Sequence, residues 1–73
     1  MAMWKKEDKG YGVESLQEML KQLGYFSGEP DGFYGVGTER AVALFQEKEG
    51  LEITGVADDN TLLVLAMRCA ALE

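Results

Sequence analysis

The stretch EPDGFYGVGTERAVALFQ, residues 29–46, decides how this chain folds. It opens with turn-forming residues, because Pro30 suits the second position of a tight turn and Gly32 can adopt a positive φ. After Gly35 the pattern changes to apolar residues three or four apart, which is typical of an amphipathic helix. The stretch therefore predicts a sharp turn that leads into a helix over 36–49.

Two further helices flank this one. The segment VESLQEMLKQL, residues 13–23, repeats apolar residues at helical spacing, and Gly24 follows where a helix commonly ends in a left-handed residue. Gly50 ends the second helix in the same way. Asp58 is a favourable N-cap for a third helix over 59–71. Three helices with short connections predict an all-α fold, a compact three-helix bundle with turn-rich loops.

The third helix is apolar on most sides. Its predicted core stripe consists of Leu62, Leu65, Ala66 and Cys69. Further apolar residues lie outside that stripe: Leu63, Val64 and Met67. Such a helix is either central to the bundle or contacts an outside partner. We expect Cys69 to be a buried core cysteine, because free cysteines are commonly buried.

The chain contains an internal pseudo-repeat of a helix followed by a loop and a second helix. Its matched pairs are Leu16-Gln17 with Phe45-Gln46, Gly24-Tyr25 with Gly50-Leu51, Ser27-Gly28 with Thr54-Gly55, and Thr38 with Thr61. The second copy is shorter than the first. The repeat predicts that the middle helix is shared between the two units.

Composition excludes several classes of function. The chain has 73 residues with a net charge of −6, so it would repel nucleic acid and anionic membranes. It contains no histidine and one cysteine, which removes Ser-His-Asp catalysis, the usual zinc sites and any intrachain disulfide. No calcium loop of the EF-hand kind is present. We therefore expect neither a metal nor another cofactor.

The sequence predicts one domain over 12–69, preceded by an N-terminal extension over 1–11 and followed by a C-terminal tail over 70–73. The final Leu-Glu pair is typical of a cloning remnant. The first ten residues contain no apolar core of a secretion signal, and no window is long and apolar enough to span a membrane. The chain is expected to be cytosolic, or to be a monomeric domain of a longer secreted protein.

The ordered motifs resemble a known family. They are V-x-x-LQ-x-x-L-x-x-LGY, DG-x-YG-x-x-T-x-x-AV-x-x-FQ and GL-x-x-TG-x-x-D-x-x-T-x-x-x-L, which together span Val13 to Leu65. This order is similar to the peptidoglycan-binding domain of the three-helix type. The chain departs from the family at Val36, where proline is frequent, and we expect this to affect stability slightly. Matrix metalloprotease prodomains share the architecture, but their PRCG motif is replaced here by MRCAA.

The resemblance implies a non-catalytic module that binds bacterial cell-wall peptidoglycan and anchors an attached hydrolase or envelope protein. It places that protein at the cell envelope or outside the cell. An alternative is a protein-protein interaction or regulatory module of the same fold that has lost wall binding, and the surplus apolar surface of the third helix motivates it. If acidic residues crowd the loop face, an amine of the stem peptide becomes the more credible contact.

A peptidoglycan binder needs hydrogen-bonding groups and an aromatic surface at the edge of a cleft. We predict a shallow groove walled by the two loops, with Tyr34 turned to the core and Phe33 exposed. The predicted ligand-binding residues are Asp31, Gly32, Phe33, Thr38, Thr54 and Asp58. The predicted structural residues are Gln17, Gly24, Tyr34, Gly35, Phe45, Gln46, Gly50, Gly55 and Thr61.

For most polar residues of the loops the structural role is favoured over ligand contact. The carboxylate of Asp31 is suited to accept backbone N–H bonds in its turn, and the threonines suit caps or packing beneath the loops. Buried glutamines usually tie a loop to a helix. The acid pairs Glu29 with Asp31 and Asp58 with Asp59 lie on a turn and at an N-cap, where both carboxylates stay ionised. They do not form a glycosidase pair, and we expect no enzymatic activity.

Overall fold

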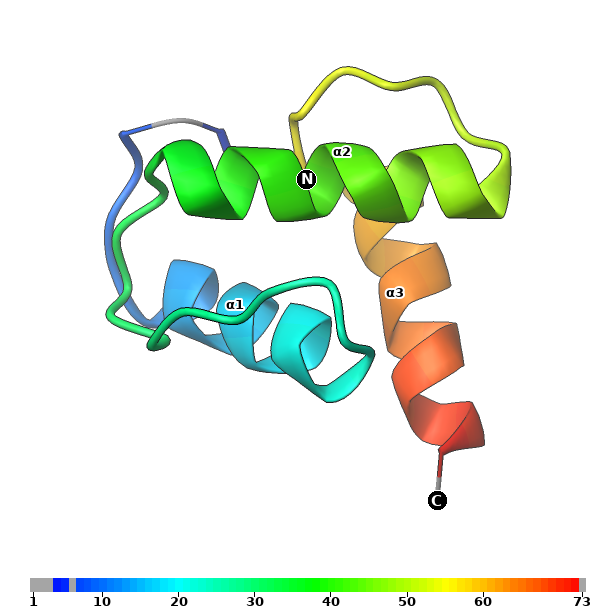
Figure 1. The fold of residues 1–73 in the computed structure, drawn as a ribbon, viewed down its shortest axis with the longest axis horizontal. Helices are drawn as coiled ribbons and strands as arrows, with labels where there is room; N and C mark the ends of the chain where they lie inside the picture. The colour runs from blue at the N-terminus through cyan, green and yellow to red at the C-terminus, as the bar shows by residue number, and fades with distance from the viewer. Residues whose placement is uncertain (1–3, 6, 73) are drawn as a thin grey trace.

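The helices begin and end close to the predicted positions. The computed structural model describes residues 4–5 and 7–72, and it contains α1 (Tyr11–Gln22), α2 (Val36–Glu49) and α3 (Asp59–Ala71) (Figure 1). The predicted bounds of α2 and α3 are confirmed, and α1 begins two residues earlier and ends one residue earlier than predicted. In the described part of the chain the elements are all helical apart from two isolated β-bridges, so the all-α fold is confirmed.

Glycine ends the first two helices as predicted. Gly24 has a φ of +88°, and the N–H of Tyr25 donates to the carbonyl of Leu20 at 2.9 Å. Gly50 has a φ of +74°, and the N–H of Leu51 donates to the carbonyl of Gln46 at 2.8 Å. Each bond satisfies a carbonyl that the last helical turn leaves open, and only glycine adopts this left-handed backbone without strain.

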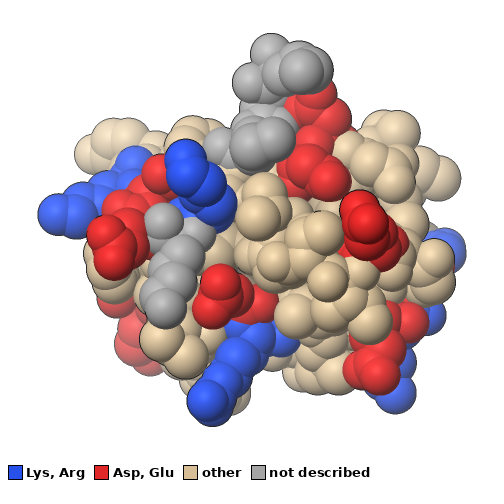
Figure 2. Space-filling view, turned by 90° about the horizontal axis from the view of Figure 1, so that it is seen from above, with Lys and Arg blue, Asp and Glu red and all other residues tan. Residues whose placement is uncertain are grey.

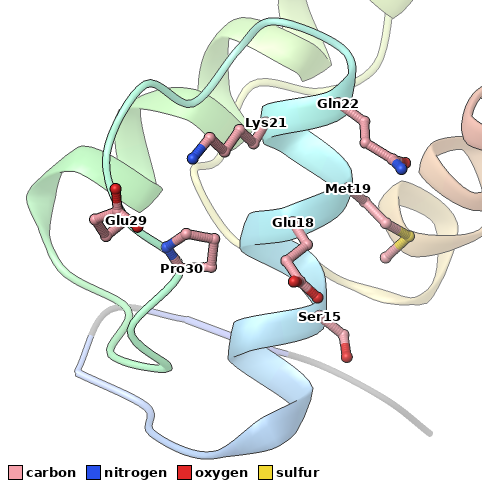
Figure 3. A pocket seen from close by; sticks show the side chains of 7 residues that line it. All are labelled: Ser15, Glu18, Met19, Lys21, Gln22, Glu29 and Pro30. Atoms are coloured by element: carbon pink, nitrogen blue, oxygen red, sulfur yellow. The ribbon is translucent and has the colours of Figure 1, made fainter.

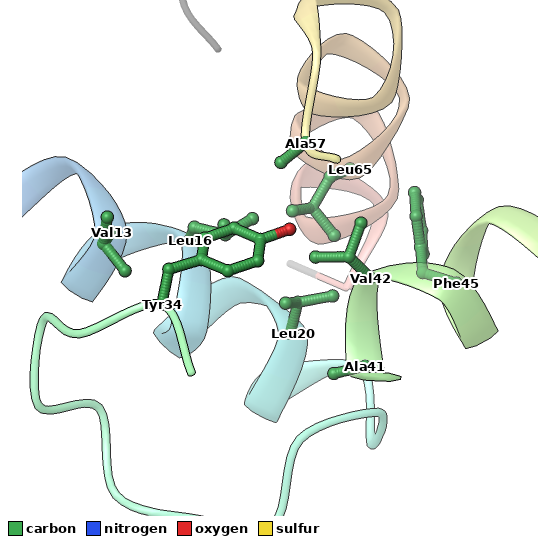
Figure 4. Packing of buried hydrophobic residues seen from close by; sticks show 9 residues of the cluster. All are labelled: Val13, Leu16, Leu20, Tyr34, Ala41, Val42, Phe45, Ala57 and Leu65. Atoms are coloured by element: carbon green, nitrogen blue, oxygen red, sulfur yellow. The ribbon is translucent and has the colours of Figure 1, made fainter. Parts of the chain in front are cut away.

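The core lies where the three helices meet the two loops. α1 packs against both α2 and α3, and α3 starts behind α2 and runs steeply away from it, beside α1 (Figure 1). The core side chains are Val13, Leu16, Leu20, Tyr34, Ala41, Val42, Phe45, Ala57 and Leu65 (Figure 4). The molecule measures 26 × 25 × 23 Å, so it is nearly as wide as it is long. This confirms the compact three-helix arrangement.

The described residues of the predicted N-terminal extension pair with both loops. Residues 4–5 and 7–10 form a strap across both loops. Trp4 pairs with Ala57 through two backbone hydrogen bonds of 2.9 and 2.7 Å, and the N–H of Tyr34 donates to the carbonyl of Asp8 at 2.8 Å. Residue 11 already belongs to α1. Because these bonds involve backbone atoms, the side-chain pattern of the strap gave no sign of them.

The third helix is less buried than its pattern suggested. Leu65 is fully buried, but Ala66 of the predicted core stripe is exposed and Cys69 is half-buried, with its thiol 3.6 Å from the carbonyl of Met19. Leu63 and Met67 are exposed as expected, whereas Val64 is half-buried and packs against the core. α3 continues to Ala71, so it includes the first two residues of the predicted tail. None of the helices in the described part of the chain is long and apolar enough to cross a membrane.

Candidate functional site

A buried glutamine on α1 holds the loop that enters α2. The side chain of Gln17 is 1% exposed. Its amide nitrogen donates to the carbonyl of Phe33 and to the hydroxyl of Thr38, both at 2.9 Å, and to the carboxylate of Asp31 at 3.1 Å. Its amide oxygen accepts the N–H of Gly32 at 2.9 Å. One side chain of α1 therefore holds three residues of the loop and also contacts Thr38 at the start of α2.

Gln46 on α2 holds the second loop in the same way. Its nitrogen donates to the carbonyl of Val56 at 2.9 Å, to the hydroxyl of Thr61 at 3.0 Å and to the hydroxyl of Thr54 at 3.3 Å. Its oxygen accepts the N–H groups of Thr54 and Gly55, both at 3.0 Å. The two loops are thus copies of one hydrogen-bonded unit. This explains why glutamine and threonine recur in both halves of the sequence.

The structure corrects one pair of the predicted repeat. Thr54-Gly55 corresponds to Asp31-Gly32 and not to Ser27-Gly28, because both pairs contact the glutamine of their own repeat. The oxygen of Asp31 accepts the N–H two residues later at 3.0 Å, and the hydroxyl of Thr54 does so at 3.1 Å. The match of Ser27-Gly28 arose because a small polar residue before glycine is a general turn signature.

Asp31 and Asp58 are both held as carboxylates by hydrogen bonds. The N–H of Phe33, followed by the amide of Gln17, lowers the pKa of Asp31 below its ordinary value. The N–H of Thr61 donates to Asp58 at 2.9 Å, and the bonds from this residue lower the pKa of Asp58. Asp58 is therefore the N-cap of α3, as predicted, and Asp31 occupies the predicted turn.

Tyr34 joins the two loops inside the core. Its ring is fully buried and its hydroxyl donates to the carbonyl of Gly55 at 2.5 Å. Burial raises the pKa of the Tyr34 phenol, so this donor stays protonated. The side chain and the strap occupy the space between the loops. Four surface hollows can be described, and residues 54–61 line none of them, so a groove between the two loops is not among these hollows.

The largest of the four hollows does not form a binding cleft. It measures about 750 Å³ and lies on the outer side of α1 beside Glu29 and Pro30. Figure 3 shows that its side chains diverge, with Met19 and Gln22 on one side of the helix and the two loop residues on the other. A ligand in this hollow would contact one wall at a time. We therefore place the candidate site elsewhere.

Two neighbouring hollows form one groove between the first loop and α2. They measure about 400 and 230 Å³, and both are lined by Phe26, Gly28 and Gly37. We call their union the aromatic groove. The larger part also contacts Tyr25, Ser27, Arg40, Ala41 and Leu44. The smaller part also contacts Gln17, Glu29, Asp31, Phe33, Gly35 and Thr38.

The groove is lined by aromatic rings and by glycines whose peptide groups are not covered by a side chain. Phe26 is half-buried and Phe33 is 42% exposed, which confirms that Phe33 faces solvent while Tyr34 faces the core. A Cβ on Gly37 would lie 3.8 Å from the ring of Phe26, and one on Gly35 would lie 3.2 Å from the ring of Phe33. The glycines therefore leave room for a ligand beside both rings, and they expose peptide groups to it.

Some of the predicted ligand-binding residues line the aromatic groove, and the others lie elsewhere. Asp31 and Phe33 line the aromatic groove, and Gly32 lines an adjoining hollow of about 260 Å³ with Lys9 and Glu14. Thr38 is 2% exposed and its hydroxyl is bonded to Gln17, so we move it to the structural group. Thr54 and Asp58 lie on the second loop, outside the groove.

Sequence reasoning missed most residues of the groove. Among them are Phe26 on the first loop and Gly37 and Arg40 on α2, and none of these three belongs to a motif that marks a ligand. Gly37 carried the clearest available signal, because glycine is unfavourable inside a helix unless something must approach its backbone.

The comparisons with known proteins match this fold and these motifs. A family model described as "Putative peptidoglycan binding domain" matches residues 9–65. The chain belongs to this family of peptidoglycan-binding domains. The N-terminal domain of SleB has a structure with a TM-score of 0.91 and 35% identity, over 93% of each chain. The motif-based resemblance is confirmed.

Relatives of this peptidoglycan-binding domain are much longer proteins. A spore cortex-lytic enzyme of Bacillus cereus is 43% identical over 56 residues, which make up 77% of this chain and 22% of the enzyme. The N-acetylmuramoyl-L-alanine amidase CwlM of Mycobacterium tuberculosis is 36% identical over 53 residues, 73% of this chain and 13% of that protein. The domain thus spans about a fifth or less of these relatives, and the similarity covers the binding module only.

Proposed function

We propose that this domain binds bacterial cell-wall peptidoglycan in the aromatic groove and thereby positions a covalently attached hydrolase or other envelope protein. The observation that carries the proposal is the groove itself, which lies beside the Gln17-held loop in a chain of the peptidoglycan-binding family. A fixed loop presents Phe33 and Asp31 at constant positions, so a ligand does not have to order them on binding.

The domain acts as a binding module without catalysis of its own. A general acid for glycoside hydrolysis needs a raised pKa, whereas the pKa values of Asp31 and Asp58 are lowered by their hydrogen bonds. The relatives named above are enzymes of the spore cortex or amidases, and this supports a position at the cell envelope as one part of a longer protein. We propose that a single copy is monomeric, and that its modest affinity is increased by tethering.

Net charge does not prevent contact with the wall polymer. On the face shown in Figure 2, acidic and basic side chains are interspersed with uncharged surface instead of being gathered by sign. The groove also combines both signs, because Arg40 lines one part of it and Glu29 lines the other. On this face the charges are therefore not gathered by sign, and at moderate salt the groups that line the groove decide binding.

Co-sedimentation with purified sacculi tests the function. We expect the domain to pellet with sacculi, and we expect Phe33→Ala and Gly37→Gln to reduce the bound fraction by removing a ring or by filling the groove. Met67→Gln is the matched control, because Met67 lies on the exposed face of α3. If the domain stays wholly in the supernatant over a range of salt concentrations, the wall-binding function is wrong.

A second candidate function uses the exposed face of α3. Leu63 and Met67 are 60% and 58% exposed and lie four residues apart on one helix, so they can form an apolar patch that a partner could cover. In this alternative the domain docks to a neighbouring protein domain and has lost wall binding. The sedimentation experiment separates the two candidates, because the alternative predicts no pelleting and no effect of Gly37→Gln.

A further inference from the structure

The two ends of the aromatic groove carry opposite charge. Glu29 and Asp31 line only its smaller part, whereas Arg40 lines only its larger part. Phe26 and the two glycines at positions 28 and 37 are shared by both parts and therefore lie between these ends. The groove is thus a channel with an acidic end, an aromatic middle and a basic end.

We propose that this groove binds the stem peptide of peptidoglycan and not its sugars, with a free amine of the peptide at Glu29 and Asp31 and a peptide carboxylate at Arg40. The inference rests on the proposed function, and it names the part of the polymer that the same groove recognises. It also fixes the direction of the bound peptide along α2, since the two ends of the groove accept groups of opposite charge.

The charged groups at both ends are available to a ligand. In the range 4–5 and 7–72, the ion pair of the structure joins Arg68 to Glu49 at 2.8 Å, and Glu29 and Arg40 take part in none. Both hydrogen bonds to the carboxylate of Asp31 fall on its Oδ1 atom. A ligand amine at this end therefore meets two carboxylates, one of which is already held in position by Gln17.

The middle of the groove suits a peptide with small side chains. The ring of Phe26 lies 3.1 Å from the position that a Cβ on Gly28 would take, so a flat segment of bare backbone lies against the ring. Ala41 and Leu44 continue the apolar wall along α2. A peptide rich in alanine places methyl groups against such a wall, and its amides can pair with the exposed peptide groups of the glycines.

A neutral sugar would contact the rings of the groove but would not pair with its charged ends. A sugar face can stack on Phe26 or Phe33, but it carries no charge that would pair with Glu29 or Arg40. A short peptide with one free amine and one carboxylate satisfies both ends at once. The charge pattern, more than the rings, therefore selects the peptide.

Three soluble probes test the inference by chemical shifts of backbone amides. They are the pentapeptide acetyl-L-Ala-γ-D-Glu-L-Lys-D-Ala-D-Ala, whose lysine amine is its one amine, the same peptide acetylated also on the lysine amine, and the disaccharide of N-acetylglucosamine and N-acetylmuramic acid with its lactyl carboxyl amidated, which is uncharged. We expect the free pentapeptide to shift the amides of Phe26, Gly28 and Gly37. Acetylation should weaken binding by about twofold to fivefold, the range expected for loss of one exposed ion pair. The disaccharide should leave these amides unchanged.

Two neutralising variants locate the charged contacts. Glu29→Gln should reduce the difference between the free and the acetylated peptide, because Asp31 alone then remains to pair with the amine, and Arg40→Gln should weaken both peptides by about twofold to fivefold. Glu52→Gln and Lys48→Gln change the net charge equally, lie outside the groove and should leave the affinities unchanged. Unchanged circular dichroism of all four variants shows that the fold is kept.

The outcomes separate the inference from the function. Binding to sacculi together with shifts caused by the disaccharide, and none caused by the pentapeptide, overturns the stem-peptide assignment and leaves the function standing. Equal affinity for the free and acetylated peptides overturns the placement of the amine at Glu29 and Asp31. Absence of binding to sacculi overturns the function itself, whatever the soluble probes show.

Discussion

At the scale of single residues, two glutamine side chains organise both loops. Each amide is buried, and each donates and accepts bonds that a loop backbone would otherwise lack. In the described part of the chain every buried side-chain nitrogen or oxygen has a hydrogen-bond partner. An amide suits this position because it carries a donor and an acceptor without a charge that burial would penalise.

Replacing Gln46 by leucine should lower the free energy of unfolding by about 2–4 kcal/mol. The leucine fills most of the volume, but it leaves the N–H groups of Thr54 and Gly55 without their acceptor and removes one donor from the carbonyl of Val56. Urea unfolding measures the change. Gln22→Leu on the exposed face of α1 is the matched control and should change stability by less than about 0.5 kcal/mol. Equal effects of the two substitutions would contradict the role given to Gln46.

We expect the domain to lose stability in acid, because the carboxylates of Asp58 and Asp31 become protonated. The folded pKa of Asp58 lies below its ordinary value of 3.8, so the folded state binds its proton more weakly than the unfolded state does. The stabilisation is therefore complete well above pH 3.8, and it is lost as pH falls through the lowered folded value. Asp31 acts in the same direction.

Thermal unfolding measured from about pH 5 to about pH 2 tests this dependence. These limits enclose the ordinary pKa of aspartate. Asp58→Asn keeps an N-cap acceptor but cannot titrate, so its melting temperature should depend less on pH than that of the unchanged protein. A variant with an undiminished slope would show that Asp58 does not contribute to acid unfolding.

At the scale of elements, the glycines of α2 have opposite roles at its two ends. Gly37 has a helical backbone, and a Cβ there would make an ordinary contact of 3.8 Å with Phe26. Gly50 has a φ of +74°, and a Cβ there would meet nothing within 4 Å. Space permits a side chain at both positions, so the backbone angle alone decides the effect of a substitution.

Gly37→Ala should stabilise the domain by about 0.5–1 kcal/mol, because alanine loses less backbone freedom in a helix. Gly50→Ala should destabilise it by about 1 kcal/mol, because a left-handed backbone strains alanine. For a domain of this size, each kcal/mol of changed stability shifts the melting temperature by roughly 4–8 °C. Shifts of the same sign in both variants would contradict the backbone explanation.

The helices could be predicted from sequence because their signals are local. Gly24, Gly50 and Asp58 mark ends through their own backbone or side chain, and the family motifs fixed the order of the elements. The candidate site could be predicted only in part. Asp31 and Phe33 lie in a recognisable turn, whereas the partnership of Phe26 with Gly37 depends on how the loop folds back on α2. Contacts between distant segments leave no periodic trace in the sequence.

At the scale of the whole molecule, the strap ties the two repeats together. Its backbone pairs with Tyr34 of the first loop and with Ala57 of the second, and the half-buried indole of Trp4 packs on the core. The indole also lies against α1, because a Cβ on Gly12 would be 2.1 Å from its Cζ2 atom. The strap therefore contributes to stability as a third connection between the loops and α1.

Gly12→Ala should cost about 1–3 kcal/mol, because the added methyl group would displace Trp4. In a Trp4→Ala background the same substitution should instead stabilise the domain by about 0.5–1 kcal/mol, as expected for alanine in a helix. Chemical unfolding of both single variants and the double variant completes the cycle. Additive effects would show that the strap does not contact α1 in solution.

The strap also determines how copies of the domain would be strung together. Trp4 pairs with Ala57, just before α3, whereas Leu72 follows the far end of that helix (Figure 1). The entry and exit points of the polypeptide are thus about 20 Å apart, the length of 13 helical residues at 1.5 Å each. Neighbouring domains on either side would therefore be separated by the length of α3. Successive copies would form an extended chain and would not fold back on one another.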